Sequence, residues 1–308
     1  MDTSPLSGRV ALVAGATRGA GRALAVELAR SGAFVYATGR SSRTAGASEI
    51  GRVETIEDTL DLVVGAGGAG AAVRVDHTQP DEVRALVERI RTDHGRLDVL
   101  VNDIFGGDRY AQFGTPLWEH DLEGGLRMLR MGVDTHVITS ALSLPLMLES
   151  GGGLLIEMTD GPREVNTAYR AGVGFFYDYV KGSIDRFITS LTAELAEQPV
   201  TVVGVTPGWL RSEAMLEAFE VTEETWTLAA DRIPGFGASE TPTYVARGVA
   251  ALAADLAVGR HHGSVLTARQ LSDEYGVTDV DGSRPDCWGV IRDLGWEDQP
   301  LGVLHKYR

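Results

Sequence analysis

The chain alternates between short apolar runs and longer segments whose apolar residues recur at helical spacing. Residues 9–14 form an apolar run that ends in glycines, and residues 20–30 then carry leucines on one helical face. This order predicts a strand, a tight turn and a helix. The pattern repeats along most of the chain. Further strands are expected at 33–38, 71–75, 97–101, 153–158, 201–205 and 264–266, and further helices at 53–64, 80–94, 122–148, 177–196 and 244–256.

Such alternation with short connections is typical of right-handed βαβ units. It predicts an α/β fold, a single Rossmann-type domain over residues 1–308 with a doubly wound parallel sheet and helices on both faces. The Gly- and Ala-rich residues 65–72 are expected to be a flexible connection. Residues 41–52 and the tail after 266 match no core element, so we expect surface additions there, the tail forming an extension near 268–308.

The composition narrows the class of protein. Hydrophobic residues make up 44% of the chain, and no uninterrupted apolar run approaches the roughly 20 residues that cross a bilayer, so no membrane partner is expected. A formal net charge of -15 argues against nucleic-acid binding, which needs clustered Lys and Arg. Residues 1–8 lack the features of a secretory signal, and the single cysteine, Cys287, cannot form an internal disulfide. These observations predict a cytoplasmic protein.

Three glycines directly follow the first expected strand and open the first expected helix. Gly15, Gly19 and Gly21 have the spacing GxxxGxG. At such a place the backbone can approach a pyrophosphate closely, and the N-terminus of the helix favours negative charge. A tight connection without a ligand would show the same glycines. Because a strand precedes them and a helix follows, we favour dinucleotide binding.

The end of the second expected strand indicates which dinucleotide is bound. A carboxylate at this place bonds the ribose 2′-hydroxyl and repels a 2′-phosphate, whereas this chain has Gly39-Arg40-Ser41. Arg40 offers a guanidinium to a phosphate, and Arg18, Ser41 and Arg43 are further candidate donors. A solvated surface arginine is the alternative. We expect NADP(H) as the cofactor.

A tyrosine and a lysine lie four residues apart on the helix expected at 177–196. At this spacing the side chains of Tyr177 and Lys181 project from the same helical face. A nearby ammonium favours the phenolate and lowers a tyrosine pKa from its ordinary value of about 10, so the pair could pass a proton to or from a substrate oxygen. The spacing also occurs by chance on solvated helices, and Tyr179 adds ambiguity.

Other residues complete an ordered set of motifs. Asp76 follows the third expected strand, Asn102 the fourth, and Pro207-Gly208 the sixth. Together with the three glycines and the Tyr-x-x-x-Lys pair, they make the chain resemble the short-chain dehydrogenase/reductase family. The resemblance covers about residues 7–215 well and the last expected helix and strand more loosely.

The resemblance implies roles for these residues. Tyr177 would be the proton donor or acceptor, and Lys181 would hold the nicotinamide ribose and lower the Tyr177 pKa. The nicotinamide would contact Pro207-Gly208. The remaining implied cofactor-binding residues are Thr17, Asp76 facing the adenine, His77, Asn102 shaping the pocket, and Ser212 at the position of a threonine that touches the carboxamide.

The chain departs from the family pattern at three places. The Asn-Asn-Ala-Gly segment appears as Asn102-Asp103-Ile104-Phe105, Asp160 stands where a catalytic serine is expected, and Gly132 falls near the position of a catalytic asparagine. An ionised Asp160 could not donate a hydrogen bond to the reacting oxygen. A protonated Asp160 or the hydroxyl of Thr159 could, and we expect Asp160 to face the nicotinamide.

The leading hypothesis is an NADP(H)-dependent oxidoreductase that moves a hydride between the nicotinamide and a carbonyl or secondary alcohol of a small molecule. The alternatives are a catalytically impaired dinucleotide-binding sensor or scaffold, and a methyltransferase or other Rossmann-like enzyme. We expect a homo-oligomer without a metal. A substrate lid is expected near residues 209–240. Its aromatic residues include Phe219, Trp226 and Phe236. Phe105, Trp118 and His136 are candidates for lining the pocket, with packing in the core as the alternative.

Overall fold

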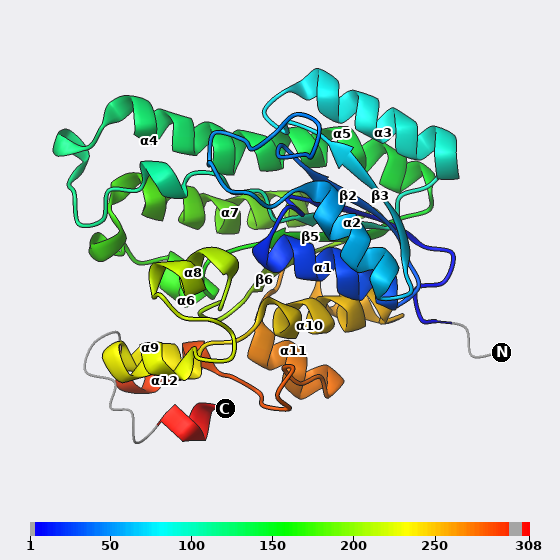
Figure 1. The fold of residues 1–308 in the computed structure, drawn as a ribbon. Helices are drawn as coiled ribbons and strands as arrows, with labels where there is room; N and C mark the ends of the chain where they lie inside the picture. The colour runs from blue at the N-terminus through cyan, green and yellow to red at the C-terminus, as the bar shows by residue number, and fades with distance from the viewer. Residues whose placement is uncertain (1–3, 296–303) are drawn as a thin grey trace.

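The computed structural model describes residues 4–295 and 304–308. A parallel sheet lies at its centre, with helices on both faces (Figure 1). The strand order is β3-β2-β1-β4-β5-β6-β7, so the chain winds outward from β1 in one direction and then from β4 in the other. The strands are β1 (Val10–Ala14), β2 (Phe34–Gly39), β3 (Ala69–Arg74), β4 (Val99–Asn102), β5 (Gly153–Met158), β6 (Val200–Thr206) and β7 (Val265–Thr267).

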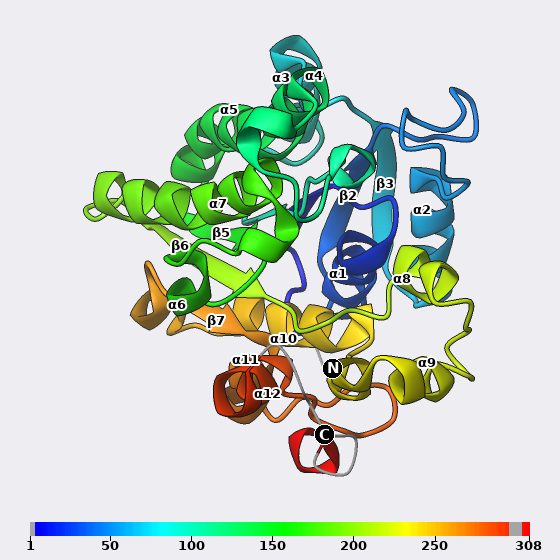
Figure 2. The same cartoon turned by 90° about the vertical axis from the view of Figure 1, so that its left-hand side faces the viewer.

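Two layers of helices cover the sheet, as the two views in Figures 1 and 2 show. On one face lie α1 (Gly19–Arg30), α2 (Ile56–Gly65) and α10 (Pro242–Ala254), and on the other α3 (Pro80–His94), α4 (Leu122–Leu129), α5 (Thr135–Glu149) and α7 (Phe175–Glu194). Shorter helices are α6 (Arg163–Asn166), α8 (Glu213–Ala218), α9 (Thr227–Arg232), α11 (Ala268–Tyr275) and α12 (Cys287–Leu294). The doubly wound α/β architecture predicted from the sequence is confirmed.

The buried strands explain both hydrophobic cores. Along β1, Ala11 and Val13 point into the core under α1 and α10, whereas Val10 and Leu12 point into the core under α3, α5 and α7. Side chains alternate between the faces of a strand, and a sheet covered on both faces needs apolar residues at every position. This requirement accounts for the continuous apolar runs in the sequence.

The strand order also determines where a ligand can bind. The chain reverses its direction of winding between β1 and β4, so the loops that follow these two strands separate at the carboxyl edge of the sheet. In open α/β sheets this separation forms a crevice for ligands. The glycine loop follows β1, and the segment that begins at Asp103 follows β4.

Two expectations about connections are wrong. Residues 65–72 do not form a flexible connection throughout, because β3 already begins at Ala69 and pairs with β2 from Phe34 to Gly39. Small residues suit this strand, since a Cβ on Gly70 would come within 2.4 Å of the Val35 carbonyl oxygen. The tail after 266 is likewise more than a surface addition. It forms α11 and α12, and Leu271 of α11 is fully buried against α10. Part of the extension expected at 268–308, residues 296–303, lies outside the described structure.

The helix expected at 122–148 consists of α4 and α5 joined by a π-helical turn, Arg130–Asp134. Gly132 lies inside this turn, and insertions of this kind in helices often lie beside functional sites. By length and composition the stretch Leu122–Glu149 could cross a membrane, but half of its apolar window is buried within the protein. The core helix of a soluble protein gives the same signal.

Candidate active site

The glycine loop is built so that backbone, and not side chains, surrounds the N-terminus of α1. Gly15 has φ +95, and a Cβ on it would lie 2.3 Å from the carbonyl oxygen of Asp103. A Cβ on Gly21 would lie 2.2 Å from the carbonyl oxygen of Gly15. Both contacts are impossible for real side chains, so these positions require glycine. The loop therefore has the close backbone packing that a pyrophosphate site needs.

A cleft runs from this loop along the carboxyl edge of the sheet. The expected cofactor-binding residues that line it are Gly15, Thr17, Arg18, Gly19, Arg40, Ser41, Asp76, His77 and Ser212. The expected residues that do not line it are Gly21, Asn102, Thr159, Asp160, Tyr177, Lys181, Pro207 and Gly208. The cleft thus covers the region expected to hold the adenosine and its phosphates. Arg18 is partly buried here, and this burial lowers the pKa of its guanidinium.

Arg40 lies at the end of β2 and is already paired. Its Nη1 is 3.1 Å from Oε1 of Glu49, and the same oxygen accepts hydrogen bonds from Nε and Nη2 of Arg127 at 3.1 and 3.0 Å. Arg43 instead pairs with Asp58 and Asp61 and does not line the cleft. The sequence analysis missed Glu49 and Arg127, which are 78 residues apart.

Asp76 and His77 follow β3 with different surroundings. Burial favours a raised pKa for Asp76, but hydrogen bonds from the Thr78 hydroxyl and amide outweigh it and hold the pKa below its usual value. His77 is fully enclosed, with Nε2 2.8 Å from the Thr38 hydroxyl and Nδ1 2.8 Å from that of Thr139. Burial lowers its pKa to about 3, so the ring is neutral. Asp76 therefore offers a negative charge to the cleft, while His77 links β2 to α5.

Asn102, the last residue of β4, and Asp103, the next one, have different surroundings. Asn102 is fully buried and donates its amide to Ser140 and Glu157 at 2.9 and 2.7 Å, so it lies beneath the cleft and not in its wall. Asp103, which the sequence analysis treated only as a departure, lines the cleft and hydrogen-bonds the Gly21 backbone. Burial raises its pKa to about 7, although the nearby Lys181 counteracts this. Asp103 is a candidate functional residue at the floor of the site.

Tyr177 and Lys181 lie on the first turns of α7. The Lys181 ammonium is 3.8 Å from the centre of the Phe105 ring and 5.6 Å from that of Tyr177. Phe105 packs edge-on against Tyr177, with ring centres 5.6 Å apart. The expected lowering of the Tyr177 pKa is not found. Burial and the charges of Asp160 and Asp108 raise it well above the usual value, so the hydroxyl is a protonated phenol.

The residues after β5 are engaged with their neighbours. The Thr159 amide bonds Val205 of β6, and its hydroxyl is 3.3 Å from the side-chain amide of Asn166. Asp160 lies near enough to raise the Tyr177 pKa, but its carboxylate is held 3.2 Å from Nη1 of Arg170. The sequence analysis missed Arg170, which comes from a loop without a recognisable motif.

Gly132 has a steric reason for lacking a side chain. A Cβ at this position would lie 2.4 Å from Cγ1 of Val180 on α7 and 3.1 Å from Cδ2 of Phe105. An asparagine therefore cannot fit between α7 and the π-helical turn. Four residues later, His136 is buried with Nδ1 2.5 Å from Glu157 Oε2 and Nε2 3.0 Å from the Ile104 carbonyl oxygen.

The segment expected as a lid packs on itself and on the tail. Phe236 is fully buried among Trp209, Phe219 and Trp226, with ring centres 4.9 to 6.2 Å away. These aromatic rings form the core of the segment. Among the other aromatic candidates, Trp118 is 84% exposed and does not line the cleft.

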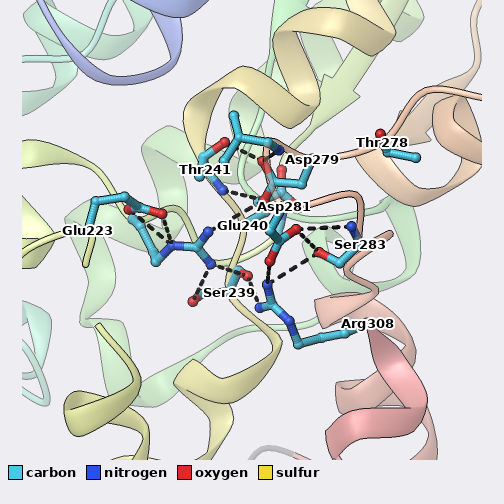
Figure 3. A network of polar contacts seen from close by, with 12 residues as sticks. Glu223, Ser239, Glu240, Thr241, Thr278, Asp279, Asp281, Ser283 and Arg308 are labelled. Carbon is cyan, nitrogen blue, oxygen red and sulfur yellow. Dashed lines mark hydrogen bonds and ion pairs between the residues drawn. The ribbon is translucent and has the colours of Figure 1, made fainter. Parts of the chain in front are cut away.

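Polar contacts tie this segment to the tail (Figure 3). Arg211, almost fully buried, bonds Glu223 and the Ser239 carbonyl oxygen, which also accepts from Arg308. Asp279 accepts hydrogen bonds from the Thr241 amide and hydroxyl. The tail therefore helps to hold the segment over the carboxyl edge of the sheet.

The Pro207-Gly208 segment contacts the tail and also the end of the segment expected as a lid. The Pro207 carbonyl oxygen accepts from Nε1 of Trp288 on α12 at 2.7 Å. The Gly208 amide donates to Glu240 at 3.0 Å, and burial raises the pKa of this carboxyl well above its usual value. At α8, Glu213 accepts from the Gly19 amide at 2.9 Å and pairs with Arg22. One turn of α8 thus contacts the N-terminus of α1.

Comparison with known proteins agrees with this geometry. A family model with the description Enoyl-(Acyl carrier protein) reductase matches residues 15–267. Dehydrogenase/reductase SDR family member 1 of Mus musculus is 31% identical in an alignment 308 positions long, which covers 95% of this chain and 92% of that protein. The chain belongs to the short-chain dehydrogenase/reductase family. Among solved structures similar to this member of the family, a 7α-hydroxysteroid dehydrogenase in complex with NADH and 7-oxo glycochenodeoxycholic acid has a TM-score of 0.69 at 21% identity, covering 92% of this chain and 97% of that chain.

A second structural neighbour contains the other cofactor. A short-chain dehydrogenase from Shigella flexneri 2a, in complex with NADP, has a TM-score of 0.68 at 20% identity and covers 87% of this chain and 100% of that chain. At these identities the neighbours show the fold alone. As a short-chain dehydrogenase/reductase, the chain is an oxidoreductase whose family uses a nicotinamide cofactor and acts on small carbonyl or alcohol substrates.

Proposed function

We propose that the protein is an NADP(H)-dependent oxidoreductase that interconverts a carbonyl compound and a secondary alcohol, with Tyr177 as the proton donor or acceptor. One observation carries the proposal. Asp103 hydrogen-bonds Gly21 in the glycine loop, and the charge of Lys181 acts on its pKa. Lys181 in turn lies beside Tyr177. This proximity supports one continuous site from the phosphate-binding loop to the proton donor.

The protein's own groups supply binding and the proton. The glycine loop fits a pyrophosphate, as the cradle at Gly15 and Gly21 indicates, and the bound cofactor would supply the hydride. In carbonyl reduction the substrate oxygen takes a proton from Tyr177, whose raised pKa keeps it protonated at neutral pH. The ammonium of Lys181 then stabilises the negative charge left on the phenolate oxygen.

The preference for NADP(H) is supported by charge at the end of β2. Arg40 lines the cleft, and Arg127 lies beside it, so two guanidinium groups face one carboxylate of the loop, Glu49. A 2′-phosphate contact of roughly 1.5 to 3 kcal/mol corresponds to about ten- to a hundredfold in affinity. Fluorescence titration should therefore give tighter binding of NADPH than of NADH, and Arg40→Ala should erase most of the difference. Equal dissociation constants would contradict this preference.

The activity itself can be tested with a panel of aldehydes, ketones and quinones. Ketosteroids belong in it, since a similar protein of Clostridium sardiniense is a 7α-hydroxysteroid dehydrogenase, 28% identical over 69% of this chain and 74% of that protein. We expect oxidation of NADPH by at least one carbonyl compound and its loss in Tyr177→Phe, with cofactor binding nearly intact. More than a few per cent of the wild-type rate in Tyr177→Phe would exclude this residue as the proton donor.

A cofactor-binding sensor or scaffold is the second candidate. It is favoured by Asp160 and Thr159, which are engaged with Arg170 and Asn166 instead of standing free to donate to a substrate. Tight NADPH binding without turnover of any carbonyl compound in the panel would support this function. The cytoplasmic location and the homo-oligomeric state stay predictions.

A further inference from the structure

The carboxylate that faces Arg40 comes from the loop between β2 and α2. We propose that Glu49 is a specificity-determining residue, because its carboxylate occupies the place where Arg40 and Arg127 would receive a 2′-phosphate. The inference rests on the proposed function, since it concerns the cofactor of the same site. In this arrangement Glu49 competes with the 2′-phosphate and reduces the preference for a phosphorylated cofactor.

The first argument is the geometry of the two guanidinium groups. Nη1 of Arg40 and both Nε and Nη2 of Arg127 point at a single oxygen, Oε1 of Glu49, from 3.0 to 3.1 Å. Several charge-assisted donors on one oxygen form an arrangement that also suits a phosphate oxygen. The Arg40 side chain is only 19% exposed and packs against Gly106, so few other conformations are open to it.

Glu49 lies between two residues of the cleft wall. Its neighbours Ser48 and Ile50 both line the cleft, and Arg109 donates to its backbone carbonyl oxygen. The carboxylate itself turns back toward Arg40. An anion that enters this end of the cleft therefore meets the loop beside Glu49.

Glu49 differs from Asp76, a second carboxylate near the two arginines, in how firmly its side chain is held. The charges of Arg40 and Arg127 also reach Asp76, and they lower its pKa. Asp76 is held in place by the amide and hydroxyl of Thr78. Within the described part of the chain, the hydrogen bonds of the Glu49 side chain go to the two arginines. Glu49 is therefore the carboxylate that can withdraw, and while it stays it repels a second anion.

The test replaces the charge and measures binding of cofactor fragments to the full-length protein. Adenosine 2′,5′-bisphosphate carries the 2′-phosphate, and 5′-AMP lacks it. Because both are fragments of the cofactor, their binding can be measured without catalysis. In calorimetric titrations we expect Glu49→Gln to bind the bisphosphate about tenfold more tightly than the wild type. Binding of 5′-AMP should stay within about twofold.

A matched control removes the same charge nearby. Glu57 bonds the backbone of Arg43 on the outer side of the loop and does not line the cleft, so Glu57→Gln should change neither affinity. Unchanged bisphosphate binding in Glu49→Gln would overturn the inference, as would an equal gain for both fragments. A gain of the same size in Glu57→Gln would overturn it too.

A measurement on the wild type keeps the test independent of any folding defect in the variant. In a crystal structure with adenosine 2′,5′-bisphosphate, the Arg40–Glu49 pair should be broken and the phosphate should contact both arginines. An intact pair would refute the competition. The wild-type ratio of NADPH to NADH affinity tests the proposed function separately. If the wild type preferred NADH while Glu49→Gln gained affinity for the bisphosphate, the inference would stand and the cofactor assignment would fail.

Discussion

The buried pair of Glu157 and His136 allows a prediction of stability. Glu157 is fully buried in β5, a strand inside the sheet, where its carboxylate accepts from the Asn102 amide at 2.7 Å and from the Ser140 hydroxyl at 3.3 Å. The carboxylate also lies 2.5 Å from Nδ1 of His136. Both nitrogens of His136 face acceptors, since Nε2 lies against the Ile104 carbonyl oxygen. The hydrogen bond across the short contact between the ring and the carboxyl group is therefore part of a fully buried polar network.

Replacement of Glu157 by leucine conserves volume but removes the acceptor of three buried groups. Removal of one partner of a buried pair typically costs about 3 to 5 kcal/mol, a large share of a total stability of about 5 to 15 kcal/mol. We therefore expect Glu157→Leu to lower the free energy of unfolding by about 3 to 5 kcal/mol. Urea denaturation followed by circular dichroism and by tryptophan fluorescence measures this change.

A double mutant and a control test the cause. With both polar partners gone, Glu157→Leu/His136→Leu should lose about 2 kcal/mol less than the sum of the two single variants. Glu27 is also buried, but its partner Arg30 is half exposed, so Glu27→Leu should cost less than about 1 kcal/mol. A loss below about 1 kcal/mol in Glu157→Leu, or strict additivity in the double mutant, would refute the reasoning.

Three further predictions follow from the site. Because the Tyr177 pKa is raised above its usual value of about 10, the phenol stays protonated as the pH rises through neutral, so Tyr177 itself should cause no loss of carbonyl reduction there. A loss of rate near neutral pH that persists in Asp103→Asn, which removes the carboxyl that titrates near 7, would contradict this assignment. Gly21→Ala should abolish cofactor binding in titrations, since its Cβ would lie 2.2 Å from the Gly15 carbonyl oxygen. Retained affinity would contradict this prediction, because the loop could then move to accept a side chain. The Asp103 pKa is raised to about 7 from an unfolded value of 3.8, so the native state holds the proton more tightly and stability falls as the pH rises between these values. Asp103→Asn should therefore raise the melting temperature more at pH 8 than at pH 4, and an equal shift at both would contradict the effect of burial.

The sequence was informative where one physical rule acts over many residues. Buried parallel strands need continuous apolar runs, so the sheet could be predicted, and the glycine loop carries its steric requirement at Gly15 and Gly21 in the residue type itself. The start of β3 was missed because its residues, from Ala69, are as small as those of a flexible connection. Nothing in the local pattern distinguishes a strand from a loop there.

The parts of the site that depend on pairing at a distance could not be predicted. Glu49 meets Arg127 from 78 residues away, and no periodicity records which surface charges come together. The Tyr-x-x-x-Lys spacing indicated that Tyr177 and Lys181 share a face. It could not indicate that the ammonium points at Phe105, or that burial and the charges of Asp160 and Asp108 raise the Tyr177 pKa.

The packing of α11 against α10 determines how far the protein can be shortened from its C-terminus. Leu271 covers the face of α10, and the buried carboxylate of Asp279 accepts from the Thr241 amide. A protein cut after the last strand would keep all seven described strands but expose that face and leave Thr241 without its acceptor. Limited proteolysis should accordingly spare α11, and fragments made for crystallisation need the chain through at least Asp279.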